Sequence, residues 1–170
     1  MNKIKDINKG DIIAFKANDK RFKALLCTGT FKERSPLYFN FAALTVDQQD
    51  VPSLTDIHDS FFYGIGNRKD DYFEYSEPEL QKMWTIHPNI QPYFLGSYTL
   101  TIWRKDFMKF RDNMEYIGRL NIIDNLDKNG NGSVNASNLD FLKDFFNEKH
   151  KSLLKERGQE LFRIIAIIRD

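Results

Sequence analysis

Apolar-rich stretches separated by polar turn residues recur along the first two thirds of the chain, which is a pattern of β-strands. Residues 11–17 and 21–31 are rich in apolar side chains and flank the polar triplet Asn18-Asp19-Lys20, which predicts a hairpin. The same kind of pattern predicts further strands at 37–46, 93–104 and 116–123, and residues 61–66 form a short apolar segment that ends at glycines. These strands indicate a mainly antiparallel sheet.

Two helices and a last strand are expected in the rest of the chain. Ser76-Glu77-Pro78-Glu79 is a capping box with proline in the first turn, so a short helix is predicted near 77–84. Apolar residues at helical spacing predict a long helix near 138–157. The apolar run 160–169 is predicted to be a strand in the middle of the sheet, with both faces covered. Because no linker or repeat interrupts the pattern, we expect an α+β fold in a single domain, residues 1–170.

Composition narrows the class of protein. A chain of 170 residues with 41% hydrophobic and 29% charged residues is large enough to fold without a disulfide or a metal. The single cysteine, Cys27, lies in an apolar stretch and is expected to be a buried, inert thiol. Residues 1–10 are polar and do not resemble a secretory signal, and the longest apolar run, 164–168, is far too short to span a bilayer. We therefore expect a soluble cytoplasmic protein that does not enter membranes.

The distribution of charge is more informative than its sum. The net charge of +1 argues against bulk attraction to nucleic acid. Residues 1–34 contain nine bases and four acids, whereas residues 47–79 contain nine acids and two bases. An acidic middle segment favours contact with a basic partner, although solvated loops would have the same composition.

Acids and aromatic residues are interleaved at 70–79, a mixture typical of protein recognition surfaces. The predicted partner-binding residues are Asp70, Asp71, Tyr72, Glu74, Tyr75, Glu77 and Glu79. The alternative is an edge strand with Phe73 turned inward and the charges in water. Nucleic-acid binding would instead require basic residues among these aromatics.

Residues 127–138 resemble the calcium loop of an EF-hand, and more closely that of dockerin modules. Oxygen donors and glycine stand at the required spacing, and the candidate ligands are Asp127, Asn129, Asn131 and Ser133. Because Asp127 is the only carboxylate, such a site would bind calcium weakly, at roughly 10⁻⁴ to 10⁻³ M. The alternative is an Asn/Gly-rich turn that leads into the long helix, with Ser137 or Asn135 as its cap.

No catalytic residues are predicted, and no cofactor other than weakly bound calcium is expected. The three histidines are scattered, and His150 is expected on the polar side of the long helix. The run Asp56-Ile57-His58-Asp59 contains a carboxylate–imidazole pair, which leaves a hydrolase as an alternative. The chain contains no nucleophile-elbow motif, no zinc-type spacing and no phosphate-binding glycine loop.

The segment from Lys9-Gly10-Asp11 to Phe15, followed by a turn and residues 22–27, resembles the opening of the bacterial immunity protein 26 family. Residues 51–57 and 98–123 also fit the family pattern, whereas the part from Asn138 onward does not. The resemblance implies a twisted, partly closed antiparallel sheet without catalytic residues. It further implies a cytoplasmic antidote that binds and blocks the toxic domain of a secreted bacterial toxin.

Overall fold

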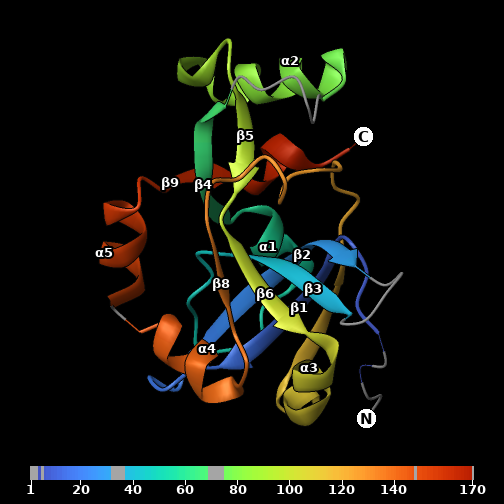
Figure 1. Cartoon of the computed structure of the whole chain (residues 1–170), viewed down its shortest axis with the longest axis vertical. Helices are drawn as coiled ribbons and strands as arrows, with labels where there is room; N and C mark the ends of the chain where they lie inside the picture. Colours follow the sequence, from blue (N-terminus) through green and yellow to red (C-terminus); the bar gives the residue numbers. More distant parts are fainter. Residues whose placement is uncertain (1–3, 5, 32–36, 69–74, 148, 170) are drawn as a thin grey trace.

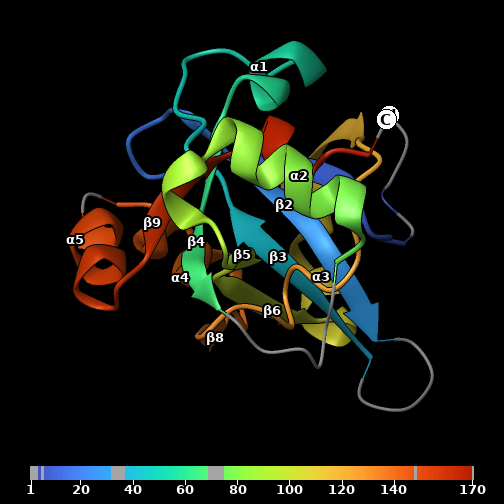
Figure 2. The same ribbon diagram turned by 90° about the horizontal axis from the view of Figure 1, so that it is seen from above.

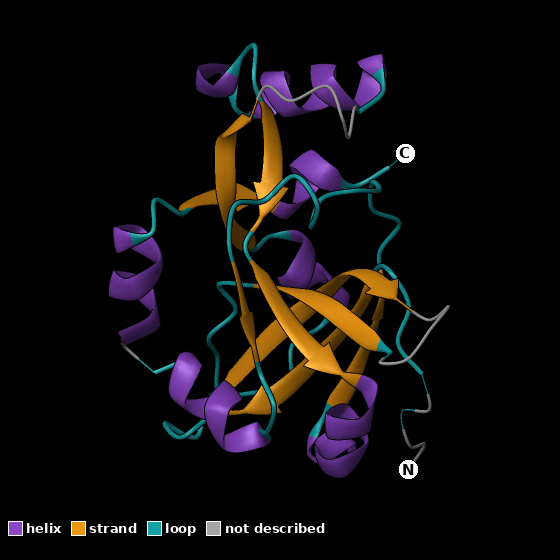
Figure 3. Ribbon diagram, viewed as in Figure 1, coloured by secondary structure: helices purple, strands orange, loops and turns teal. Residues whose placement is uncertain are grey.

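The computed structural model describes residues 4, 6–31, 37–68, 75–147 and 149–169, and it has an α+β architecture with two β-sheets. Figure 1 shows helix α2 (Glu77–Ile86) at one end of the long axis and helices α3 (Arg104–Phe110) and α4 (Leu139–Phe145) at the other. Helix α5 (Lys149–Glu156) stands at the side. The strands occupy the middle of the molecule, with helices around them (Figure 3).

The larger sheet has six strands in the order β7-β1-β2-β3-β6-β8. Its neighbouring strands are antiparallel, except that β8 runs parallel to β6. The predicted hairpin is confirmed, and Lys20 has a left-handed φ of 68° in its turn. The strands are β1 (Asp11–Lys16), β2 (Phe22–Phe31), β3 (Tyr38–Ala43), β6 (Thr99–Trp103), β7 (Glu115–Arg119) and β8 (Ser133–Asn135).

The smaller sheet is antiparallel and has the order β5-β4-β9, with β5 (Phe94–Ser97), β4 (Phe61–Arg68) and β9 (Glu160–Arg163). Residues 93–104, predicted as one strand, divide at Tyr98, so that β5 joins this sheet and β6 joins the larger one. The expectation of one partly closed sheet is therefore wrong. In the described part of the chain the strands divide between two sheets, and β7 and β8 are the edges of the larger one.

The two helix starts with a Ser-x-x-acid pattern both form capping boxes. At α2, Ser76 and Glu79 exchange backbone-to-side-chain hydrogen bonds, which confirms the predicted start of this helix. Ser53 and Asp56 do the same at α1 (Leu54–His58), a helix that was not predicted from the sequence. Each box pairs otherwise free N–H groups in the first turn. Short 3₁₀ helices lie at Pro88–Ile90, Arg111–Asn113 and Ile164–Ile167.

The predicted long helix near 138–157 is wrong, because the chain breaks into α4 and α5. Phe145 and Phe146 are both buried, at 8% and 3% exposure. The ring of Phe145 contacts that of His150, five residues further on, and two residues at that spacing do not share a face of one straight helix. Phe146 leaves the helical conformation, with a ψ of 11°, and the next helix begins with a hydrogen bond from the N–H of His150 to the carbonyl of Asn147.

The apolar C-terminal run is also not a central strand. Only Glu160–Arg163 is extended, and this strand, β9, pairs with β4 at the edge of the smaller sheet. Phe162 is buried, whereas its neighbour Leu161 is 46% exposed, so β9 has one open face. In the 3₁₀ turn Ile164–Ile167 that follows, the buried residues are Ile164, Ala166 and Ile167.

Both faces of the larger sheet are covered. On β1, Ile13 and Phe15 belong to one core cluster, while Ile12 and Ala14 belong to the other. The first core cluster is completed by the helices at the lower end of Figure 1, through Phe107, Phe110, Leu142, Phe145 and Phe146. The second is completed by α1, α2 and the smaller sheet, through Ile57, Met83, Phe62, Phe94 and Phe162. Cys27 is buried, as predicted.

Candidate functional site

Most of the predicted partner-binding segment cannot be placed, because Asp70, Asp71, Tyr72 and Glu74 lie outside the described residues. Tyr75 is 7% exposed, its hydroxyl donates to the carbonyl of Leu95 at 2.7 Å, and its ring packs edge-on against Phe94. Burial raises the pKa of this hydroxyl. The prediction of Tyr75 as a surface contact is therefore wrong, since its ring is part of the core.

Glu77 and Glu79 occupy the first turn of α2, and their charges are used differently. The carboxylate of Glu79 caps the helix and also lies 3.3 Å from Nε of Arg169. Arg169 in turn contacts Asp124, which also pairs with Lys9. Glu77 is exposed and accepts a hydrogen bond from Gln81. The described part of this segment therefore forms a balanced ion network with one exposed acid, rather than a strongly acidic face.

Two of the four candidate calcium ligands accept hydrogen bonds from side-chain amides through their side-chain oxygens. The Asp127 carboxylate accepts from the side-chain amide of Asn40 at 2.7 Å, and the side-chain Oδ1 of Asn131 accepts from the side-chain amide of Gln159 at 2.6 Å. Asn129 is 2% exposed, and Ser133 begins β8. Within the described ranges, no cluster of three His, Cys, Asp or Glu residues has the arrangement of a metal site.

The loop glycines have a steric role. A Cβ on Gly130 would lie 1.9 Å from the carbonyl oxygen of Ser97, and one on Gly96 would lie 2.1 Å from that of Asn129. The loop backbone therefore packs directly on the junction of β5 and β6, which only glycine allows. The cap of α4 is Asn138, which accepts from the N–H of Phe141, rather than Ser137 or Asn135.

The candidate hydrolase residues lie at the surface of α1. His58 Nδ1 and Asp59 Oδ1 are 3.6 Å apart, and their side chains are 51% and 73% exposed. The Asp56 carboxylate accepts from the N–H of Ser53, and this contact lowers its pKa. The role of Asp56 is thus to cap a helix, and the three side chains do not form a desolvated catalytic group.

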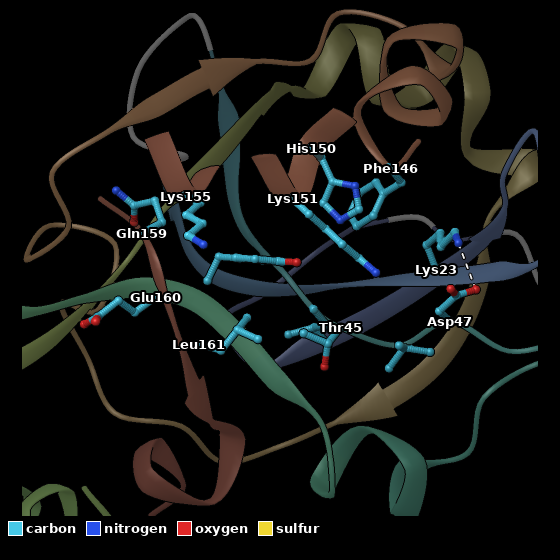
Figure 4. A pocket seen from close by; sticks show the side chains of 13 residues that line it. Lys23, Thr45, Asp47, Phe146, His150, Lys151, Lys155, Gln159, Glu160 and Leu161 are labelled. Carbon is cyan, nitrogen blue, oxygen red and sulfur yellow. Dashed lines mark hydrogen bonds and ion pairs between the residues drawn. The ribbon is translucent and has the colours of Figure 1, made fainter. Parts of the chain in front are cut away.

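A cavity of about 540 Å³ lies between α5, β9 and the segment that follows β3, and sequence reasoning missed it. It is bounded by side chains from five separate parts of the chain (Figure 4). Its lining consists of Lys23, Leu44, Thr45, Val46, Asp47, Tyr63, Phe146, His150, Lys151, Lys155, Gln159, Glu160 and Leu161.

His150 is buried in this wall, not on a polar helix face as predicted. Its ring contacts those of Tyr63, Phe145 and Phe146, with centroids 5.5–5.8 Å away. Its Nδ1 lies 2.6 Å from the carbonyl oxygen of Asn147, so Nδ1 carries the proton in the assigned tautomer. Burial lowers the pKa of His150, which favours the neutral ring with a lone pair on Nε2.

The lysines around the cavity fall into two kinds. Lys23 is 5% exposed and is held by Asp19 at 2.8 Å and Asp47 at 2.9 Å, and these contacts lower the pKa of both carboxyls. Lys151 and Lys155 are exposed on α5, and Figure 4 shows their amino groups reaching toward the cavity. No local sequence signal joins these residues, because they meet only after the two sheets have packed.

Comparison with models of protein families gives no match, and comparisons with curated proteins and with solved structures give none either. Among the described residues, no helix is both long and apolar enough to cross a bilayer.

Proposed function

We propose that this chain is a non-enzymatic immunity protein that binds the toxic domain of a bacterial toxin and blocks it. One observation carries the proposal. The stretches that resemble the immunity protein 26 family are distant in sequence but adjacent in space: β1 pairs with β7, and α1 packs on β7, where Leu54 lies against Gly118. A shared pattern in segments that contact one another is what a common fold requires.

The edge around α1 and β7 is the surface that fits a protein partner best. Three large apolar side chains are exposed there, Val51 at 48%, Leu54 at 41% and Tyr116 at 50%. The Tyr116 hydroxyl donates to Asp11 at 2.9 Å, which holds its ring in place before any partner arrives. A rigid aromatic anchor of this kind is typical of interface hot spots.

Exposed acids stand next to these apolar side chains in sequence or on the same elements, and together they define what we call the α1–β7 surface: Asp50, Val51, Leu54, Asp59, Glu115 and Tyr116. Its three carboxylates come partly from the acidic middle segment found in the sequence. Such a surface suits a toxin domain with a basic face, because complementary charge speeds association and selects the partner. Figure 2 shows α1 at the periphery of the molecule, where a partner has access to it.

The first test is affinity capture with the tagged chain from a lysate of its source bacterium, followed by mass spectrometry. The expected catch is the C-terminal part of a large secreted protein. That domain is then expressed alone and together with the chain in a naive host, and we expect growth to be restored only by co-expression. The proposal is contradicted if the captured domain is not toxic. It is also contradicted if co-expression of the chain does not relieve the toxicity.

Charge reversal then tests the surface. We expect Asp59→Lys combined with Glu115→Lys to weaken the complex by about tenfold or more, equal to ~1.4 kcal/mol. The matched control, Asp140→Lys with Glu156→Lys, changes charge equally at exposed positions of α4 and α5. An equal loss of affinity in both double variants would remove the α1–β7 surface from the proposal.

A further inference from the structure

The cavity beside α5 has the size and the walls of a small-molecule site. Its volume of about 540 Å³ falls within the range of roughly 300–1,000 Å³ that is usual for ligand pockets. It opens where the two core clusters separate, since Leu44 and Val46 belong to one cluster and Tyr63 and Phe146 to the other. None of its lining residues belongs to the α1–β7 surface, so its role is independent of the proposed function.

Two polar groups of largely buried residues border this space, and so does the buried Oε1 of Gln159, which has no hydrogen-bond partner among the described residues. Tyr63 is 7% exposed and His150 is 8% exposed. Neither the Tyr63 hydroxyl nor Nε2 of His150 has a hydrogen-bond partner among the residues that the structure describes. A ligand that fills the cavity removes water from these groups, and leaving one of them unpaired would then cost ~1–3 kcal/mol, so a ligand that pairs with them is favoured over one that does not. The hydroxyl offers a donor, and the neutral imidazole offers an acceptor.

The charge at the mouth favours an anion. Lys151 and Lys155 project toward the cavity, whereas the carboxylate of Glu160 points away from it (Figure 4). The remaining pair of opposite charges, Lys23 and Asp47, is already joined at 2.9 Å. The two α5 lysines therefore set the sign of the potential that an entering ligand meets.

We propose that this cavity binds an aromatic carboxylate that also carries a hydroxyl or N–H donor. The aromatic body packs on Leu44, Val46 and Phe146, and the carboxylate accepts from the Tyr63 hydroxyl and from the lysines. The donor on the ligand is directed to Nε2 of His150. Each part of the ligand thus corresponds to one part of the wall.

The test uses 6-hydroxy-2-naphthoate as the probe, the uncharged 6-hydroxy-2-naphthamide as its matched analogue, and decanoate as an acyl anion. Binding to the full chain is measured by isothermal titration calorimetry. We expect one naphthoate per chain, with at least tenfold weaker binding of the amide. The Lys151→Gln/Lys155→Gln double variant is expected to bind naphthoate about tenfold more weakly, and Tyr63→Phe about fivefold more weakly.

The control places the same charge change at the same spacing on another helix. Lys105→Gln with Lys109→Gln on α3 is expected to leave naphthoate affinity unchanged, as is the Asp59→Lys/Glu115→Lys variant of the α1–β7 surface. The proposal is overturned by an absence of saturable binding at 1 mM probe or by equal losses in the two lysine pairs. It is also overturned if the amide or decanoate binds as tightly as the naphthoate.

Discussion

Replacing Asp11 by alanine tests whether one buried carboxylate joins the opening hairpin to the edge strand. Asp11 is 1% exposed at the start of β1. Its oxygens accept from the N–H of Asn8 at 2.7 Å, the hydroxyl of Tyr116 at 2.9 Å and Nε of Arg119 at 2.7 Å. In the ladder, Asp11 lies opposite Arg119 of β7. The same carboxylate therefore fixes the preceding loop and the neighbouring strand.

The expected loss of stability follows from the two neutral donors to Asp11, which are the N–H of Asn8 and the hydroxyl of Tyr116. A hydrogen bond to a charged group contributes ~1.5–3 kcal/mol, and the lower end applies because Asn8 and Tyr116 regain water when the carboxylate is removed. The contact with Arg119 is screened by solvent, because the Arg119 side chain is exposed, and it adds little to the stability. Asp11→Ala should then lower the free energy of unfolding by about 3 kcal/mol. At this chain length, that corresponds to a melting temperature lower by roughly 6–12 °C.

The assay is equilibrium unfolding in urea, followed by tryptophan fluorescence and by far-ultraviolet circular dichroism. The midpoint should fall while the m-value stays constant, because the surface exposed on unfolding does not change. Asp50→Ala removes a carboxylate from an exposed position and serves as the control. A loss below about 1 kcal/mol, or one no larger than in the control, would refute the reasoning that Asp11 stabilises the β1–β7 pairing.

Three further predictions concern the loop and the cavity. The melting temperature should be the same in 5 mM calcium chloride and in chelator, because the Asp127 carboxylate already accepts from an asparagine amide; a rise of several degrees would contradict this. Gly130→Ala should abolish folding or lower the free energy of unfolding in urea by more than ~3 kcal/mol, because its Cβ would overlap the Ser97 carbonyl. Gly158→Ala is strained only by its φ of 76° and should lower that free energy by ~1 kcal/mol. Burial holds the pKa of His150 below its ordinary value of 6.5. Because the unfolded state then binds more protons than the folded state, the free energy of unfolding falls as the pH drops below about 6.5 toward the folded-state pKa. The free energy of unfolding should differ less between pH 7.5 and pH 5.5 in His150→Phe than in the unchanged chain. An equal difference in both proteins would contradict the role of His150 in this pH dependence.

Local signals in the sequence were sufficient for the elements that short-range physics decides. The β1–β2 hairpin depends on two apolar-rich stretches and one turn, and α2 depends on a capping box within four residues. Both could be predicted because the interactions that form them join near neighbours. The start of α1 carried the same Ser-x-x-acid signal at Ser53, so it could have been predicted and was missed.

The errors occurred where distant partners decide between local alternatives. Residues 93–104 alternate throughout, and nothing in that pattern marks Tyr98 as the point where the chain leaves one sheet for another. The apolar periodicity of 138–157 fits one helix equally well, and nothing in it marks the break at Phe146. The cavity is the extreme case, because its walls come from segments up to 138 positions apart, from Lys23 to Leu161.

The loop at 127–138 shows why residue types alone do not decide function. Aspartate, asparagine and glycine at this spacing provide oxygen donors and tight turns, which suit calcium and backbone packing equally. The outcome depends on groups elsewhere: Asn40 and Gln159 supply amide donors to the side-chain oxygens, and Ser97 leaves no room for a Cβ at Gly130. A cation would have to displace these amide donors, which would leave two amide groups without their partners. The Asp127 carboxylate thus holds β3 through Asn40. This structural role competes directly with metal binding.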